Sequence, residues 1–270
     1  MAARHRSVAE SETYRVQIEA DLELAERVHR SMIPRSQRRG CLEVVCRFNP
    51  MNRIGGDYAS VFFQTDTRVV ASICDVTGHG IAAALLASRV SSFVLDAAPD
   101  ARHPCEIGEA LHAFIWNNFE DTNLLLTFFC LFLDLESQSL VYSGFGHPPV
   151  LLCSKRNAAI TQLDAENTII GLARDMPVNC SMLRIPFEPG DRLILYTDGL
   201  TDTTNAAGEF LEVAGLRRTL QDTAHLSLED CVAGIVGRVE AFSDGEPPAD
   251  DQLLLALGFL EGGVPGCDGI

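Results

Sequence analysis

The chain has 270 residues, of which 47% are hydrophobic and 21% are charged, as in a globular protein with a sizeable core. Its 37 acidic residues outnumber its 21 basic residues and give a formal net charge of −16. This charge argues against nucleic acid or an anionic membrane as a partner, because both require a positive electrostatic field. It would also repel an anionic substrate, unless bound metal ions reversed the local charge.

We expect neither a membrane span nor a secretory signal. The longest apolar stretch, residues 124–133, has about half of the roughly 18 to 20 residues that a spanning helix needs. The first seven residues are not followed by the apolar segment of a signal peptide. Nine cysteines are scattered along the chain without a Cys-x-x-Cys pair, and several lie inside apolar runs. We therefore expect a cytoplasmic protein whose cysteines are reduced.

The first 40 residues differ in pattern from the rest and predict a helix followed by a linker. Residues 8–33 place apolar side chains at helical spacing between charged ones, and Pro34 ends the pattern. Residues 35–40 are polar and predict the linker. The helix could pack on its own domain, or it could form a short coiled coil that carries a signal into the next domain. About two to three heptads do not decide between these alternatives.

Residues 41–262 predict one domain, and the glycine-rich tail of residues 263–270 is expected to be disordered. Apolar and alternating runs predict strands, and runs rich in alanine and leucine predict helices. The predicted order is strands at 42–48, 61–63 and 69–74, helices at 81–95 and 105–120, strands at 125–133, 140–143, 150–153, 181–187 and 192–196, mostly helix over 208–242, and a last strand at 253–259. Runs of strands followed by runs of helices indicate an α+β fold.

Four aspartates occur where an apolar, strand-like run ends or begins. Their surroundings are Gly-Gly-Asp57-Tyr, Asp75-Val-Thr-Gly-His-Gly, Tyr-Thr-Asp198-Gly and Ala-Asp250-Asp. Each alone could be a turn former or a helix cap. Nearby glycines permit close backbone approach, and carboxylate oxygens are the ligands that Mg²⁺ and Mn²⁺ prefer. Two such ions about 4 Å apart can hold a phosphate and lower the pKa of a shared water. The residues therefore predict a binuclear metal site that hydrolyses phosphate esters.

Other phosphate-handling and metal sites have weaker support in the sequence. The chain has no G-x-x-x-x-G-K-[ST] loop, which argues against an NTPase. Its seven histidines are scattered and do not predict a histidine-rich zinc site.

Five motifs in order resemble the bacterial type 2C (PPM) protein serine/threonine phosphatases. The motifs are Gly55-Gly-Asp-Tyr58, Asp75-Val-Thr-Gly-His-Gly80, Gly146-His-Pro-Pro149, the run from Glu188 to Asp202, and Asp250-Asp251. Within the family, the sequence is similar to the sporulation stage II protein E-like branch, which includes regulators of sigma factors. The resemblance covers roughly residues 25–260.

The resemblance implies a four-layer α-β-β-α sandwich of two antiparallel sheets flanked by helices, with the metals at one edge of the sheets. It also implies a ligand set for two Mn²⁺ or Mg²⁺ ions, namely Asp57, Asp75, Asp198 and the carbonyl of Val76. Asp250 is the better match for the last ligand, and Asp251 is the alternative. A hydroxide that bridges the two ions would attack phosphoserine or phosphothreonine in line.

The resemblance further implies a phosphorylated protein as substrate, a small STAS-domain anti-sigma-factor antagonist. We predict that residues 10–33 either form a homodimer or dock a separate upstream regulator. Arg53, four residues before Asp57, could bind the substrate phosphate through two hydrogen bonds, although it could equally be an exposed loop charge.

Two departures from the family pattern leave a second hypothesis open. After Gly-Gly-Asp the family often has an aromatic pair and another acid, where this chain has Ala59 and Ser60 after Tyr58. After the acidic pair the family usually has a threonine, where this chain has Leu253. Neither change removes a predicted ligand, but both could alter the groups that orient the ligands. The alternative is a catalytically weak, phosphatase-like binding or regulatory module.

Overall fold

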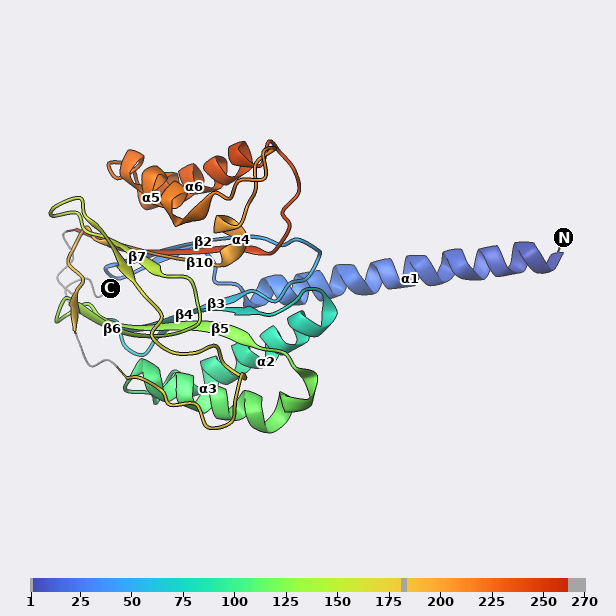
Figure 1. Ribbon diagram of the computed structural model, residues 1–270, viewed down its shortest axis with the longest axis horizontal. Coiled ribbons are helices and arrows are strands. Elements are labelled where there is room, and N and C mark those ends of the chain that lie inside the picture. Colours follow the sequence, from blue (N-terminus) through green and yellow to red (C-terminus); the bar gives the residue numbers. More distant parts are fainter. Residues whose placement is uncertain (1, 181–183, 262–270) are drawn as a thin grey trace.

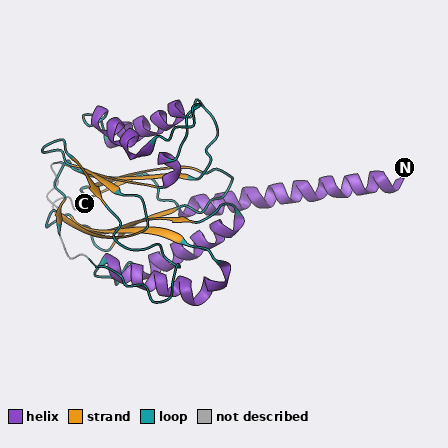
Figure 2. Cartoon of the chain, in the orientation of Figure 1, coloured by secondary structure: helices purple, strands orange, loops and turns teal. Residues whose placement is uncertain are grey.

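The computed structural model describes residues 2–180 and 184–261, with side chains from residue 14 onward. Two antiparallel sheets lie face to face, and helices cover the outer face of each sheet (Figure 1 and Figure 2). The predicted α-β-β-α sandwich is therefore confirmed. Both faces of each sheet are buried because the strands carry apolar side chains on both sides, which must be removed from water.

One sheet, sheet A, combines strands from the two ends of the domain. From edge to edge its strands are β1 (Gln37–Arg39), β2 (Leu42–Asn49), β11 (Gln252–Phe259), β10 (Arg192–Tyr196), β7 (Val150–Cys153) and β8 (Ile160–Leu163). Every neighbouring pair is antiparallel. The last strand of the chain, β11, therefore lies in the interior of the sheet beside the first long strand, β2.

The other sheet, sheet B, is built from strands that mostly follow one another in the sequence. Its order is β3 (Tyr58–Phe63), β4 (Arg68–Val76), β5 (Leu126–Asp134), β6 (Ser139–Phe145) and β9 (Ile185–Pro186). These pairs are antiparallel as well. The crossover from β4 to β5 contains the two helices that cover this sheet, so the end of β4 lies where the chain leaves the sheet.

Two pairs of helices form the outer layers. α2 (Ile81–Ala97) and α3 (Pro104–Phe119) pack on sheet B, while α5 (Glu212–Asp222) and α6 (Leu228–Phe242) lie over sheet A (Figure 1). Two shorter segments are the 3₁₀ helix η1 (Glu120–Thr122) and α4 (Asp198–Thr201). α3 begins with a proline after His103, whose side chain accepts a hydrogen bond from the backbone N–H of Cys105.

Apolar side chains fill three layers between these elements. On β11, Leu253 and Leu255 face the space between the two sheets, whereas Leu254 and Ala256 face the layer under α5 and α6. This alternation follows from the two-residue period of a strand. Because both faces of β11 are buried, its sequence is an unbroken apolar run instead of an alternating one.

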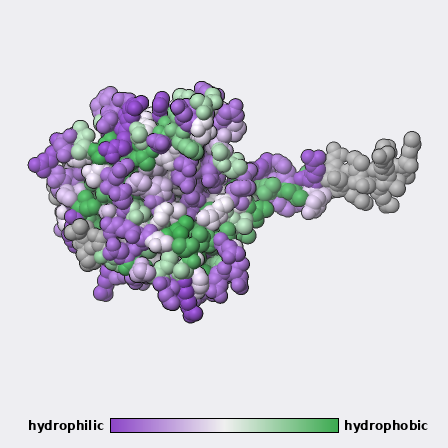
Figure 3. Space-filling view, viewed as in Figure 1, coloured by the Kyte–Doolittle hydropathy of each residue, from purple (hydrophilic) through white to green (hydrophobic). Residues whose placement is uncertain are grey.

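The N-terminal helix α1 (Ala2–Met32) projects away from the body of the protein (Figure 1). Near its C-terminal end, His29 is buried and its ring lies 5.4 Å from the ring of Phe48. Further out, Val16, Leu24 and Val28 are exposed. Figure 3 shows hydrophobic side chains along the base of this helix. None of the described helices combines the length and apolarity that crossing a membrane requires.

Several local predictions differ from the structure. The segment predicted as a linker contains the edge strand β1, and β8 was not predicted. Of the strand predicted at 181–187, the structure shows β9 at Ile185–Pro186, and residues 181–183 lie outside the described part of the chain, as does the tail at 263–270. Cys105 and Cys180 form a disulfide. The prediction of reduced cysteines is therefore wrong for this pair.

Candidate metal centre

The four aspartates lie at one end of the sandwich, where strands of both sheets begin or end. In sheet B, Asp57 precedes β3 and Asp75 is next to last in β4. In sheet A, Asp198 follows β10 by two residues and Asp250 precedes β11 by two. Antiparallel pairing brings the start of each strand beside the end of its neighbour, and a side-chain hydrogen bond from Thr197 to Asp57 joins the two sheets here.

The four carboxylates repel one another. Burial raises the pKa of Asp57 well above its usual value, and the charge of Asp75 raises it further. Burial raises the pKa of Asp75 to about 7, with repulsion from Asp198 and Asp250 adding to the shift. The pKa of Asp198 is also raised, first by burial and then by the charge of Asp250. These shifts place all four groups within one electrostatic site.

Among the described residues, no lysine or arginine forms an ion pair with any of these four aspartates. A buried carboxylate without a cationic partner is unfavourable unless it is protonated or bound to a metal. The site therefore has the charge and the oxygen ligands that a hard divalent cation requires, and the residues fit such ions. In this structure, which holds no ion, no three of the four carboxylates bring their oxygens within 4.8 Å of one another.

Exposure increases across the site from one aspartate to the next. Asp57 is 1% exposed, Asp75 and Asp198 are half-buried, and Asp250 is exposed. The cluster thus has a closed base at Asp57 and an open side at Asp250.

Thr197 fixes the aspartate at the base of the site. Its hydroxyl donates to Oδ2 of Asp57 at 2.7 Å and accepts from the backbone N–H of Leu253 at 3.0 Å. The side chain is fully buried. The threonine of the Thr-Asp-Gly motif therefore orients a carboxylate that lies 140 residues away in the sequence. Sequence reasoning missed this role, because a threonine before an aspartate has no local signal of its partner.

Asp251 has a different role from its neighbour Asp250. Its carboxylate is buried and accepts hydrogen bonds from the backbone N–H groups of Met51 at 2.9 Å and Gly56 at 2.8 Å. Asp251 therefore anchors the loop that carries Asp57. Both oxygens are used by these bonds, which supports Asp250 as the predicted ligand of the pair.

Two glycines of the motifs allow the chain to approach closely at the site. A Cβ atom on Gly56 would lie 2.8 Å from the carbonyl oxygen of Val76, which is closer than real Cβ contacts. A Cβ on Gly199 would collide with the carbonyl oxygen of Asp251. Side chains at these positions would push apart the segments that carry the aspartates. The Val76 carbonyl thus lies beside the loop of Asp57, where the resemblance implies a ligand.

His147 is a second residue whose place the sequence did not reveal. It is buried, and its Nδ1 lies 2.7 Å from the hydroxyl of Thr127, which is the register partner of Asp75 on β5. Burial lowers the pKa of His147 to about 3. The imidazole is therefore neutral at physiological pH and supports the strand beside Asp75.

Arg53 is held by the N-terminal helix. Its guanidinium forms ion pairs with Glu19 and Glu23 of α1, and the pair with Glu23 is 4.0 Å long. All three side chains are exposed, so the pairs contribute little to stability. The role of Arg53 in binding a substrate phosphate stays a prediction, and it would require Arg53 to leave these partners.

Another type of phosphatase site finds no support in the structure. Cys41 and Arg47 have the Cys-x5-Arg spacing of thiol-dependent phosphatases. The residues between them lie along β2, paired on both sides within sheet A. An extended, paired strand cannot wrap its N–H groups around a phosphate, so this spacing does not form a phosphate-binding loop.

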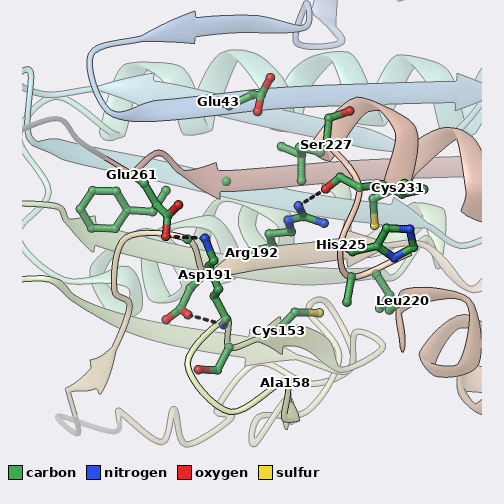
Figure 4. Close-up of a pocket in the computed structure, with 18 of the residues that line it drawn as sticks. Glu43, Cys153, Ala158, Asp191, Arg192, Leu220, His225, Ser227, Cys231 and Glu261 are labelled. Carbon is green, nitrogen blue, oxygen red and sulfur yellow. Dashed lines mark hydrogen bonds and ion pairs between the residues drawn. The ribbon is translucent and has the colours of Figure 1, made fainter. Parts of the chain in front are cut away.

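A cavity of about 490 Å³ lies at the opposite end of sheet A, beneath α5 and α6 (Figure 4). Several of its charged side chains already have partners, because Lys155 pairs with Glu261 and Arg192 donates to the carbonyl of Leu226. Arg192 begins β10, whereas Asp198 follows the other end of that strand. The cavity is therefore separate from the aspartate cluster.

The sandwich with acidic residues at one end is the PP2C fold. The SiaA-PP2C domain of Pseudomonas aeruginosa superposes with a TM-score of 0.78 at 19% identity, over 91% of this chain and 98% of that domain. RsbX in complex with magnesium superposes with a TM-score of 0.61 at 15% identity, over 83% of this chain and 98% of RsbX. At these identities the likeness establishes the fold.

The family follows from the sequence itself. Residues 65–260 match the model of the stage II sporulation protein E (SpoIIE) family, and the chain belongs to that family. The matched region includes Asp75, Asp198 and Asp250, while Asp57 lies just before it. The chain is also 23% identical to phosphoserine phosphatase RsbU of Bacillus subtilis over 241 residues, which cover 88% of this chain and 70% of RsbU.

Proposed function

We propose that this protein is a serine/threonine protein phosphatase that depends on two Mn²⁺ or Mg²⁺ ions. The observation that carries the proposal is the cluster of four mutually repelling aspartates, which have no cationic side chain as an ion-pair partner among the described residues. Membership of the SpoIIE family and the similarity to a phosphoserine phosphatase support the same reaction.

The residues of the proposed site have two kinds of role, binding the metal ions and holding the ligand-bearing segments in place. We assign Asp57, Asp75, Asp198, Asp250 and the Val76 carbonyl as ligands. When bound, the ions would neutralise these charges, attract the phosphate and lower the pKa of a water between them. Thr197 and Asp251 hold the ligand-bearing segments in place. The open side of the site, at Asp250, is where a phosphorylated side chain of another protein would enter.

The structure favours an enzyme over a weakly active binding module. Leu253, where the family usually has threonine, points into the core between the sheets, and its backbone N–H still donates to Thr197. Ala59 is buried in the same core, and the hydroxyl of Ser60 bonds to that of Ser72 at 2.8 Å. The three residues at the two departures from the family pattern therefore occupy buried positions and leave the aspartates in place.

The proposed substrate is a phosphorylated STAS-domain anti-sigma-factor antagonist in the cytoplasm. The similarity to RsbU motivates this choice. A net charge of −16 excludes attraction of an acidic phosphoprotein by the protein surface as a whole, so recognition would depend on the metals and on local contacts.

The proposed partner surface is the N-terminal helix, through residues 10–33. Beside the exposed apolar side chains of α1, Ile81 and Leu85 of α2 are 61% and 65% exposed. α1 and α2 border an apolar groove of about 540 Å³. Exposed apolar side chains on two adjacent helices are typical of a surface that is covered by a second copy or a regulator.

The decisive test of the catalytic proposal is Asp198→Asn. The variant should lose Mn²⁺-dependent release of phosphate from a phosphoserine protein, while its circular dichroism spectrum and melting temperature stay close to the unmodified values. Asp222→Asn, on the exposed end of α5, is the matched control and should keep full activity. Full activity in Asp198→Asn would refute the assignment.

The partner surface is tested by placing charges on it. Leu24→Asp combined with Val28→Asp should reduce the mass measured by light scattering if α1 forms a homodimer, or abolish co-elution with a regulator. Phe210→Asp, at an exposed apolar residue outside α1 and α2, is the matched control. Unchanged mass and unchanged activity in the double variant would contradict the proposal.

A further inference from the structure

Two cysteines and a histidine cluster at the N-terminus of α3. Cys105 and Cys180 form a disulfide across a sequence separation of 75 residues, with Cα atoms 5.8 Å apart. A ring nitrogen of His103 lies within 4.8 Å of both sulfur atoms. None of these residues belongs to the aspartate cluster, and the proposed phosphatase reaction does not use them.

The disulfide fastens one end of residues 164–180, which we call the strap. The strap has little regular secondary structure, and it is held on sheet B and α3 by individual contacts. Ile170 exchanges two backbone hydrogen bonds with Leu126, at 3.1 and 3.0 Å. Leu126 is in turn the register partner of Val76. The strap therefore reaches the strand next to the candidate metal centre.

Ile170 is also fully buried in the apolar core beneath α3, and hydrogen bonds hold other parts of the strap. His112 of α3 accepts from the N–H of Gly171 at 3.4 Å and lies 3.2 Å from the carbonyl of Arg174. Asn167 is buried and bonds to the N–H of Asn179, which closes the strap upon itself. Residues 172–175 are exposed. Within the described part of the chain, the disulfide is the one covalent link between the strap and α3.

The surroundings of the two sulfur atoms favour reversible thiol–disulfide exchange. Nδ1 of His103 accepts the N–H of Cys105 at 3.3 Å, which orients the ring, and Nε2 is buried without a hydrogen-bond partner among the described residues. An imidazole beside two sulfurs can accept a thiol proton, and the thiolate is the nucleophile in disulfide exchange. The N-terminus of α3 also favours a negative charge on Cys105. Cys180 is more exposed than Cys105 and would meet an oxidant first.

We propose that Cys105 and Cys180 are a reversible redox pair that exchanges with low-molecular-weight disulfides and thiols, and that its state sets how firmly the strap is held on α3. Disulfides that do form in the cytoplasm are usually transient and serve catalysis or redox sensing. The proposal concerns the strap alone and does not depend on phosphatase activity.

The reaction consists of two thiol–disulfide exchanges. The Cys180 thiolate attacks one sulfur of a disulfide R–S–S–R, forms a mixed disulfide and releases one R–S⁻. The Cys105 thiolate then attacks the Cys180 sulfur, forms the intramolecular bond and releases the second R–S⁻. Two electrons pass from the cysteines to R–S–S–R, and the two thiol protons end on the two released thiols. Two R–SH molecules reverse both steps.

The first experiment titrates the full chain with mixtures of oxidised and reduced glutathione, followed by alkylation and mass spectrometry of peptides. We expect both thiols to disappear together into one linked peptide, and to return when reduced glutathione is in excess. In Cys180→Ser no intramolecular link can form, and Cys105 should be found as a free thiol or, when oxidised glutathione is in excess, as its mixed disulfide with glutathione. Absence of the linked peptide at all ratios would overturn the proposal.

A metal site is the competing outcome, because two thiolates and an imidazole are also zinc ligands. One equivalent of zinc retained by the protein, with both cysteines resistant to oxidised glutathione, would overturn the redox pair. Protein without zinc that oxidises reversibly supports it.

The second experiment measures amide hydrogen exchange with and without reduction. Reduction should accelerate exchange at Gly171 and Asn179 about tenfold or more, because the strap then opens locally, while exchange in β11 stays unchanged. Cys180→Ser should match the reduced protein under both conditions. Equal exchange of the strap in the two redox states would refute the proposed effect on the strap.

The role of His103 is tested with His103→Asn. Asparagine keeps a side-chain acceptor for the first turn of α3 but removes the imidazole. We expect oxidation by glutathione disulfide to slow about tenfold while the melting temperature is retained. An unchanged oxidation rate would exclude His103 from the reaction.

Discussion

The hydroxyl of Thr197 joins the two sheets behind the candidate metal centre, and Thr197→Val removes this hydroxyl while keeping the shape of the side chain. In the structure the hydroxyl donates to Asp57 and accepts from the N–H of Leu253. Because the residue is fully buried, water cannot replace either bond. Valine fills the same space, so the effect of the substitution comes from the lost hydrogen bonds and not from a cavity.

Two separate losses set the expected magnitudes. The N–H of Leu253 is left buried without a partner, which costs about 1–3 kcal/mol of unfolding free energy. Asp57 loses the group that orients its carboxylate, and removing such a group behind a metal ligand typically lowers metal affinity about 10- to 100-fold. We therefore expect a folded but less stable protein whose Mn²⁺ affinity falls by one to two orders of magnitude.

The assay combines urea unfolding in the presence of a chelator with calorimetric titration of Mn²⁺. Thr197→Ser is the matched control, because serine keeps the hydroxyl and should retain most of the affinity. The reasoning fails if the valine variant binds Mn²⁺ as tightly as the serine variant. Loss of affinity in both variants would show that the methyl group, and not the hydrogen bond, positions Asp57.

Three further predictions use other parts of the structure. Asp250→Asn should abolish tight Mn²⁺ binding without lowering the stability of the metal-free protein. Asp251→Ala should instead lower the unfolding free energy by about 2–4 kcal/mol, because two backbone N–H groups lose their acceptor. Equal Mn²⁺ affinity and equal unfolding free energy in the two variants would contradict these separate roles. Burial lowers the pKa of His147 from 6.5 to about 3, so the unfolded chain binds a proton first as the pH falls. The contribution of His147 to stability is then lost below about pH 6.5 by up to about 1.4 kcal/mol per pH unit, while the raised pKa values of Asp57 and Asp75 act in the opposite direction. The difference in unfolding free energy between the unmodified protein and His147→Asn, measured in urea titrations, should show the His147 slope. Cys180→Ser should lower the unfolding free energy by about 2–4 kcal/mol in non-reducing buffer, because the disulfide closes a loop of 75 residues. An unchanged melting temperature in this variant would contradict a stabilising disulfide between Cys105 and Cys180.

The α+β class and the four aspartates could be predicted because their signals are local, whereas the sandwich architecture came from the resemblance. Each aspartate stands beside an apolar strand, and three have glycine nearby, so a few adjacent residues suffice to mark them. The order of strands and helices gave the α+β class for the same reason. The choice of Asp250 over Asp251 came from the resemblance, and the hydrogen bonds of Asp251 support it.

What the sequence could not reveal depends on contacts between distant residues. Nothing near Thr197 indicates that its hydroxyl bonds to a residue 140 positions away. Cys105 and Cys180 lack the close spacing that marks a cysteine pair, so their disulfide depends on how the strap crosses α3. β8 was missed because it is an edge strand with two of its four residues exposed, which leaves only a weak apolar pattern.

Because each sheet supplies two of the four aspartates, the candidate metal centre exists only while the sheets are docked. Ions bound there would link the two sheets, because their ligands come from both. Their binding free energy would add directly to the free energy of docking the sheets. In metal-free protein the same carboxylates repel one another across this end, which raises the pKa values of Asp57 and Asp75. Metal supply would thus set how tightly this end of the sandwich is closed, before any substrate arrives.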